Sequence, residues 1–137
     1  MDTKTVSYNR VSDILECLKS SSDKNFFIEI CAFIGYCSKE NNYIISFEDN
    51  ISSDPKNFFC ISPAKYLKFK NTYEIIAVFH SHNVGDEEPS EFDIKMSENC
   101  CIPFMIFSIN SRKFHFYEPQ NQQYNVKLAT RFKENFL

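Results

Sequence analysis

The sequence has 137 residues, the length of one domain, and 43% of them are hydrophobic, which is enough for a buried core and excludes a largely disordered chain. The net charge of −3 argues against a nucleic-acid-binding protein, and two glycines are too few for glycine-rich phosphate-binding loops. No apolar run approaches the roughly 20 residues that a membrane-spanning helix needs, so we expect no membrane insertion.

The first half of the chain is predicted to begin with a helix and to continue with strands. The helix is indicated by apolar residues at helical spacing: Val11, Ile14, Leu15 and Leu18. The polar residues 20–25 predict a connector, and the Phe- and Ile-rich residues 26–37 predict a strand. A turn at residues 41–42 and a returning strand at residues 43–47 follow, before a polar loop at residues 49–56.

The second half is predicted to alternate strands and helices. In chain order its elements are a strand at residues 58–61, a helix at 62–70, a central strand at 73–79, a loop at 80–89, a helix at 90–99, a hairpin of residues 104–109 and 113–117, and a helix at 125–136. The order α-β-β-β-α-β-α-β-β-α indicates one mixed α/β (α+β) domain over residues 1–137, with a mostly antiparallel sheet flanked by helices.

A candidate metal site follows the predicted central strand. His80 and His82 are two residues apart, so both imidazoles can point to one side of a strand while Ser81 faces away. Asp93 comes eleven residues later, in the first turn of a helix that Ser90 is expected to cap. Two imidazole nitrogens and one carboxylate oxygen are a common ligand set for catalytic zinc, which keeps a fourth position for water.

Glu29 is the candidate general base, because it stands in an apolar segment where an unpaired carboxylate is costly to bury. Each residue also has a simpler interpretation. The two histidines can be polar residues at a strand end, and Ser90 can be only a helix cap. Asp93 can be a surface residue that compensates the helix dipole, and Glu29 can be a salt-bridged residue of an edge strand.

Taken together, these positions resemble the JAMM (MPN+, Mov34/PAD-1) metalloprotease motif. That motif is a Glu on an early strand, then His-Ser/Thr-His, seven residues, Ser, two residues and Asp. In this sequence the matching positions are Glu29, His80-Ser81-His82, Ser90 and Asp93. Residues 29–35 also resemble the family's Glu-x-Cys-Gly opening, although Ala32 replaces the usual Gly and Asn83 replaces the Pro that commonly follows the second His.

Within this family, residues 57–66 and 102–108 resemble segments of the N-terminal JAMM domain of tail-assembly protein K of lambda-like phages, and the resemblance covers residues 25–119. It implies an MPN/JAB (cytidine-deaminase-like) fold. The resemblance also implies roles for individual residues, with zinc held by His80, His82 and Asp93. Glu29 would be the general base, and Ser90 would hydrogen-bond the developing oxyanion.

The resemblance implies a zinc metallopeptidase or isopeptidase domain of a tailed-phage tail or tail-tip protein. Its expected partners are tail-tip proteins or a peptide substrate, and its expected locations are the host cytoplasm during assembly and the virion tail. No signal peptide is expected at the N-terminus. Many proteins of this branch carry a second, cysteine-peptidase-like domain, and with the sequence ending at Leu137 we expect none here.

Two alternatives remain open. The first is a stand-alone JAMM isopeptidase that removes ubiquitin-like modifiers, although only seven residues separate His82 from Ser90, which leaves little material for gripping a modifier. The second is a non-catalytic tail component stabilised by zinc, in which Cys31 would be the fourth ligand. We expect Cys31 to be buried, reduced and away from the metal, and most of the six cysteines to be buried free thiols.

Overall fold

The computed structural model describes residues 4–136. Its elements in chain order are β1 (Lys4–Tyr8), α1 (Val11–Lys24), β2 (Cys31–Cys37), β3 (Asn42–Glu48), α2 (Pro63–Thr72), β4 (Glu74–His82), α3 (Glu91–Cys100), β5 (Phe104–Ser108), β6 (Phe114–Tyr117) and α4 (Val126–Glu134). The strands form one sheet in the order β1-β3-β2-β4-β5-β6. Among these described strands, β4 and β5 are parallel and the other neighbours are antiparallel. The predicted α+β class with a mostly antiparallel sheet is therefore confirmed.

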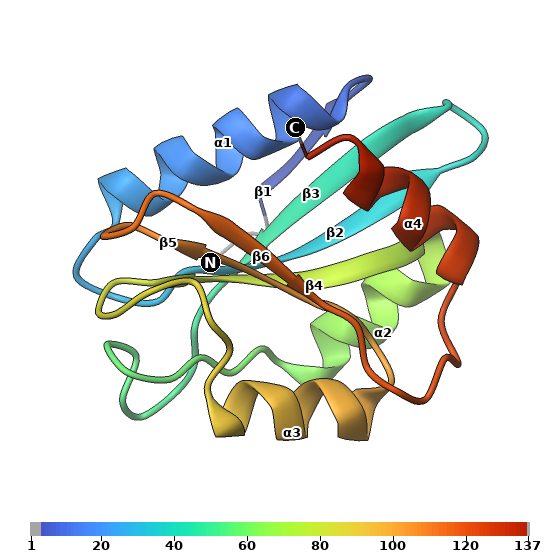
Figure 1. Ribbon diagram of the computed structural model, residues 1–137. Coiled ribbons are helices and arrows are strands. Elements are labelled where there is room, and N and C mark those ends of the chain that lie inside the picture. The colour runs from blue at the N-terminus through green and yellow to red at the C-terminus, as the bar shows by residue number, and fades with distance from the viewer. Residues whose placement is uncertain (1–3, 137) are drawn as a thin grey trace.

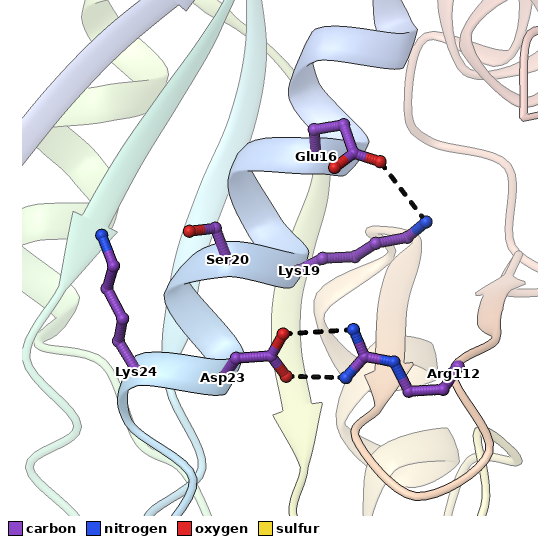
Figure 2. A pocket seen from close by; sticks show the side chains of 6 residues that line it. All are labelled: Glu16, Lys19, Ser20, Asp23, Lys24 and Arg112. Carbon is purple, nitrogen blue, oxygen red and sulfur yellow. Dashed lines mark hydrogen bonds and ion pairs between the residues drawn. The ribbon is translucent and has the colours of Figure 1, made fainter.

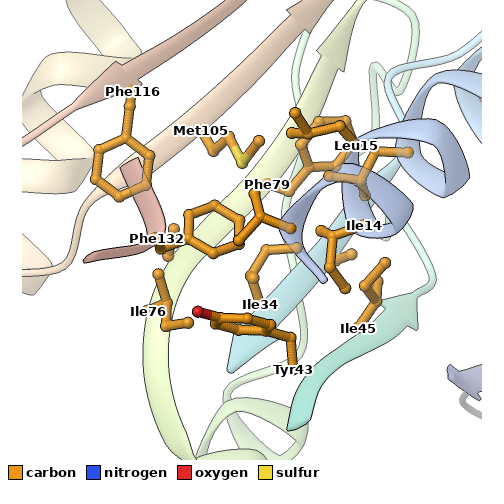
Figure 3. Close-up of a cluster of buried hydrophobic side chains, with 14 of the residues drawn as sticks. Ile14, Leu15, Ile34, Tyr43, Ile45, Ile76, Phe79, Met105, Phe116 and Phe132 are labelled. Atoms are coloured by element: carbon orange, nitrogen blue, oxygen red, sulfur yellow. The ribbon is translucent and has the colours of Figure 1, made fainter. Parts of the chain in front are cut away.

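Helices cover both faces of the sheet, with α1 and α4 on one face and α2 and α3 on the other (Figure 1). Under α1 and α4 lies the larger core cluster, in which Ile14 and Phe132 meet Ile45 and Phe79 of the sheet (Figure 3). All four of these side chains are fully buried. Burying a side chain of this size stabilises the fold by about 1.5–3 kcal/mol, so this cluster anchors β4 in the centre of the sheet.

The smaller cluster lies under α2 and α3, on the face that carries the histidines. Phe69 of α2 stacks on Phe33 of β2, with ring centroids 5.2 Å apart, and Val78 and Phe104 complete the contact. Gly35 allows this close approach, because a Cβ atom there would lie 2.6 Å from the Phe69 ring and 2.8 Å from a backbone oxygen. No helix in residues 4–136 is long and apolar enough to cross a membrane.

Strand β1 precedes the helix that the sequence predicts as the first element. Its residues Val6 and Tyr8 are half-buried and pack against the larger core cluster, whereas Thr5 and Ser7 between them are exposed. The strand lies at the edge of the sheet and pairs only with β3 in the described chain. A five-residue edge strand with two core-facing side chains carries too weak an alternation to be recognised from sequence.

Helix α1 extends to Lys24, so the predicted connector at residues 20–25 is wrong for most of its length. The buried Ser22 hydroxyl donates to the Leu18 carbonyl at 2.8 Å, inside the helix. Asp23 forms a two-pronged ion pair with Arg112 from the turn after β5, at 2.6 and 3.1 Å (Figure 2). The local bond of Ser22 and the tertiary ion pair of Asp23 thus accompany a helical turn that the modest helix propensity of serine does not predict.

Two predicted strand segments are not strands. Residues 26–30 precede β2, and Phe26 and Phe27 are 64% and 60% exposed. Residues 58–61 lie in the loop between β3 and α2. Neither segment forms a strand ladder. The Glu29 N–H and the Cys60 carbonyl bond to loop residues, and Ile30 bonds to Ser81 of β4 at a single position, where the Ile30 N–H donates to the Ser81 hydroxyl at 2.9 Å. The apolar residues therefore mark the region of the cleft and not additional strands.

Candidate metal centre

Strand β4 brings the two histidines to the middle of the sheet. It runs through His82, three residues beyond the predicted strand end, and it lies between β2 and β5. His80 is opposite Cys31 of β2 and Ile106 of β5. His80 is fully buried and His82 is 9% exposed, so both rings are held inside the protein.

Asp93 of α3 meets both imidazoles. One of its carboxylate oxygens lies 3.2 Å from Nε2 of His80, and the other lies 3.1 Å from Nε2 of His82. One ligand atom from each of these residues lies within 4.8 Å of those of the other two, so this group could hold a metal ion. The strand alternation and the helix position read from the sequence thus converge on one place in the structure.

The imidazole of His82 is oriented for metal binding. Its Nδ1 lies 2.8 Å from the carbonyl oxygen of Asp86. Because a carbonyl only accepts, Nδ1 carries the proton and Nε2 of the neutral ring keeps its lone pair. The loop that carries Asp86 is held in turn by the buried Ser108, whose hydroxyl donates to the Gly85 carbonyl at 2.8 Å.

His80 has the unsatisfied atoms expected of a metal ligand. Both of its ring nitrogens are buried without a hydrogen-bond partner in residues 4–136, because the Nε2 contact with Asp93 lacks hydrogen-bond geometry. A buried polar atom left unpaired costs about 1–3 kcal/mol. Phe59 stacks on the ring with centroids 4.3 Å apart and fixes its orientation. A divalent cation such as zinc would satisfy Nε2, so the donor set fits the metal that the sequence predicts.

Ser90 and Asp93 form a capping box at the start of α3. The Ser90 hydroxyl accepts from the Asp93 N–H at 3.0 Å, and the Ser90 N–H donates to the Asp93 carboxylate at 3.0 Å. Ser90 therefore caps this helix as the sequence predicts, and the cap also aims the Asp93 carboxylate at the histidines. Burial alone would raise the pKa of Asp93, but the two imidazoles that face its carboxylate outweigh burial and hold this pKa well below its usual range.

Glu29 lies in the same cleft as the metal-binding group. It is 8% exposed and lines a cavity of about 230 Å³ together with His82, Ser90 and Asp93. Burial raises the pKa of Glu29 to about 8, although the nearby His82 opposes the rise. Glu29 is not one of the three clustered ligands, and it precedes β2 instead of lying on a strand. The Glu29 carboxyl therefore lies in the cleft without belonging to the group that could hold a metal ion.

Ser81 connects the histidine strand to the segment that carries Glu29. It is fully buried, its hydroxyl accepts from the Ile30 N–H at 2.9 Å, and its own N–H donates to the Ile30 carbonyl at 3.0 Å. Sequence reasoning places Ser81 away from the histidines but assigns it no contact. The contacts of Ser81, Asp86 and Ser108 join residues distant in sequence or involve backbone atoms. No local sequence pattern therefore predicts these hydrogen bonds.

Cys31 does not belong to the ligand group in the described chain. It is buried, its Sγ lies 3.5 Å from the Glu48 carbonyl, and burial raises its pKa to about 12, which keeps the thiol protonated. All six cysteines are free, as predicted. The expectation that most of them are buried is wrong, because only Cys31 is buried, while Cys60 and Cys100 are exposed and the rest are half-buried.

Replacing Cys31 by Ser is expected to lower the free energy of unfolding by about 1 kcal/mol, because a buried thiol packs better among apolar side chains than a hydroxyl does. Metal binding is expected to be retained. Denaturant unfolding and a metal titration measure the two quantities, with Cys100→Ser as the exposed control. Loss of the metal in Cys31→Ser would show that the sulfur is a ligand.

The chain matches no family model. It is 24% identical over 94 residues to tail tip assembly protein K of Escherichia phage N15, a match that covers 69% of this chain and 38% of that protein. The chain is a distant relative of a phage tail tip assembly protein. Protein DSY2949 of Desulfitobacterium hafniense, known from a solution structure, matches with a TM-score of 0.55 over 74% of this chain and 75% of that one. At 19% identity this second match shows that the fold is shared.

Proposed function

We propose that this chain is a zinc-dependent metallopeptidase or isopeptidase domain that acts in the tail or tail tip of a tailed phage. The observation that carries the proposal is the buried carboxyl of Glu29 in the same cleft as His82 and Asp93, which together with His80 could hold a metal ion. The distant relationship to tail tip assembly protein K supports the phage context. The match covers 38% of that protein, so the proposal concerns the activity of this domain and not that of a whole assembly protein.

The three ligand residues favour a catalytic zinc site over a structural one. Structural zinc sites are closed by four protein ligands, whereas catalytic sites keep one position open. In the described chain the group consists of His80, His82 and Asp93, and Cys31 is outside it. This arrangement argues against the alternative of a tail component that binds zinc for stability alone.

Zinc, when bound, would polarise the scissile carbonyl and lower the pKa of a water molecule in the cleft. Glu29 would remove one proton from the attacking water and deliver it to the nitrogen of the leaving amine, so that the carboxylate is restored after each cycle. Burial raises the pKa of Glu29 to about 8 in the metal-free protein, and a cation bound nearby would lower this pKa and favour the carboxylate that accepts the proton. The amide C–N bond breaks as this proton reaches the nitrogen.

Ser90 would donate its hydroxyl proton to the oxygen on which charge develops. The acceptor role of its oxygen toward the Asp93 N–H does not use that proton. One such donor contributes about 3–4 kcal/mol of transition-state stabilisation at most. We propose tail-tip proteins or peptides as substrates, met in the host cytoplasm during assembly or at the virion tail.

The test is cleavage of a tail protein. The zinc-loaded chain would be incubated with its neighbouring tail-tip proteins and with a mixed peptide library, and mass spectrometry would identify new termini. We expect cleavage that a chelator abolishes and that added zinc restores. A zinc-loaded, folded chain that cleaves neither the tail proteins nor any peptide would refute the proposed function.

A further inference from the structure

The carboxamide of Asn50, in the loop between β3 and α2, holds two separate stretches of chain together. Its Nδ2 donates to the carbonyl of Glu29 at 2.8 Å and to the carbonyl of Phe58 at 2.9 Å. Its Oδ1 accepts from the N–H of Ser52 and from the N–H of Cys60, both at 3.1 Å. The two hydrogens and the two lone pairs of the carboxamide are thus all used.

The Glu29 backbone is attached to this loop on both sides. Its carbonyl accepts from Asn50, and its N–H donates to the carbonyl of Pro55 at 2.8 Å. No strand of the described chain pairs with Glu29, because β2 begins at Cys31. The position of the Glu29 carboxyl therefore depends on the loop. Asn50 is the loop side chain that hydrogen-bonds the Glu29 backbone.

The same loop forms one wall of the cleft over the metal-binding group. Its residues Lys56, Asn57 and Phe58 line the cavity. Phe58 also contacts Phe92 of α3 edge-on, with ring centroids 5.5 Å apart. Asn50 bonds the Phe58 carbonyl as well as the Glu29 carbonyl. One carboxamide therefore contacts the backbone of both the cleft wall and the proposed base.

We propose that Asn50 is a positioning residue that fixes Glu29 and the cleft wall relative to the metal ligands. The expected effect of Asn50 on catalysis rests on the proposed function. Its expected effect on the position of Glu29 and the cleft wall does not. The residues that would hold the metal come from β4 and α3, which Asn50 does not touch in the described contacts. Its loop reaches them through Phe59, which stacks on His80. Because β4 and α3 carry the three side chains independently of the loop, loss of the carboxamide should loosen the base and the wall but leave the metal bound. The Ser81 bond to the next residue, Ile30, keeps the segment attached to β4.

The test compares Asn50→Ala and Asn50→Asp with Asn125→Ala. The Asp variant keeps the size of the side chain and its acceptor atoms but removes the donor that reaches Glu29. Asn125 caps α4 by accepting from the Leu128 N–H at 3.1 Å, and it does not line the cavity, so its replacement removes side-chain hydrogen bonds outside the cleft. Three quantities are measured in each variant: zinc affinity, backbone hydrogen exchange in residues 26–30 and 50–60, and kcat and KM for any substrate that the wild type cleaves.

Both Asn50 variants are expected to bind zinc as the wild type does and to exchange faster in residues 26–30 and 50–60. Their kcat is expected to fall by about 10–100-fold, because a catalytic group displaced by about 1 Å costs up to this much, with a smaller change in KM. Asn125→Ala is expected to match the wild type in all three quantities. If Asn50→Ala fails to fold, Asn50→Asp decides the matter.

Unchanged exchange in both segments of a folded Asn50 variant would overturn the proposal. Loss of zinc together with faster hydrogen exchange in these segments would also overturn it, because Asn50 would then support the whole site. A similar loosening of residues 50–60 in Asn125→Ala would show general destabilisation and would refute a specific role. If the zinc-loaded wild type cleaves nothing, the proposed function fails, and exchange and zinc affinity still decide whether Asn50 positions Glu29.

Discussion

Replacing Glu29 by Gln is expected to reduce peptide cleavage by about 10²–10⁴-fold, the usual contribution of a general acid–base group, while zinc stays bound. Gln has nearly the same shape and cannot accept and return a proton. Glu29 is not among the clustered metal ligands, so the variant should hold about one zinc per chain. The measurement is the cleavage rate of the zinc-loaded variant against the wild type, with zinc content determined on the same samples.

The matched control is Glu16→Gln. Glu16 is an exposed residue of α1, with a side chain that is 77% exposed, and the same chemical change there should leave cleavage unaffected. Wild-type activity in a zinc-loaded Glu29→Gln protein would remove Glu29 from the mechanism. Loss of zinc from that variant would instead place the carboxyl on the metal.

Glu29→Gln should also change how the stability of the metal-free protein depends on pH. Burial raises the pKa of Glu29 from 4.5 to about 8, so the folded state binds more protons than the unfolded state between these values. Stability contributed by the protonated carboxyl is therefore present below pH 4.5 and is lost as the pH rises toward 8. The variant should lose less stability than the wild type over this range, which thermal unfolding of the two proteins at several pH values would show.

The double replacement His80→Ala/His82→Ala is expected to abolish metal binding, because only the carboxylate of Asp93 would remain from the group. The wild type should bind about one zinc per chain and should unfold at a higher temperature when zinc is present. The double variant should contain no stoichiometric zinc, and added zinc should not raise its unfolding temperature. Elemental analysis and thermal unfolding measure both effects.

His115→Ala is the matched control for the metal. His115 lies on β6, away from the cleft, so its loss should leave zinc content unchanged. Full zinc occupancy in the double histidine variant would place the metal elsewhere in the protein and would end the zinc-site hypothesis. If the double variant does not fold, the single variant His82→Ala is tested in its place. His82 is the less buried of the two histidines, so its loss should disturb the fold less.

The metal-binding group could be predicted from sequence because short-range geometry sets each of its parts. His80 and His82 point to one side because strand residues alternate, and Asp93 turns toward its cap because Ser90 stands three residues before it. These relations span at most three residues within one element. The helices at α2, α3 and α4 and the hairpin of β5 and β6 were predictable for the same reason.

The surroundings of Glu29 were decided by the tertiary structure. The sequence by itself determined that a carboxyl stands among Phe and Ile residues, and this apolar setting suggested a strand from residue 26, whereas β2 begins at Cys31. The Asn50 bond to Glu29 spans 21 residues, and the Ser81 bond to Ile30 spans 51. A polar side chain carries no local signal for the partner that it will find at such separations, because that partner depends on how the sheet brings the loop and β4 together. Periodicity therefore determined that the two histidines face one side of a strand, and long-range hydrogen bonds decided where the proposed base lies.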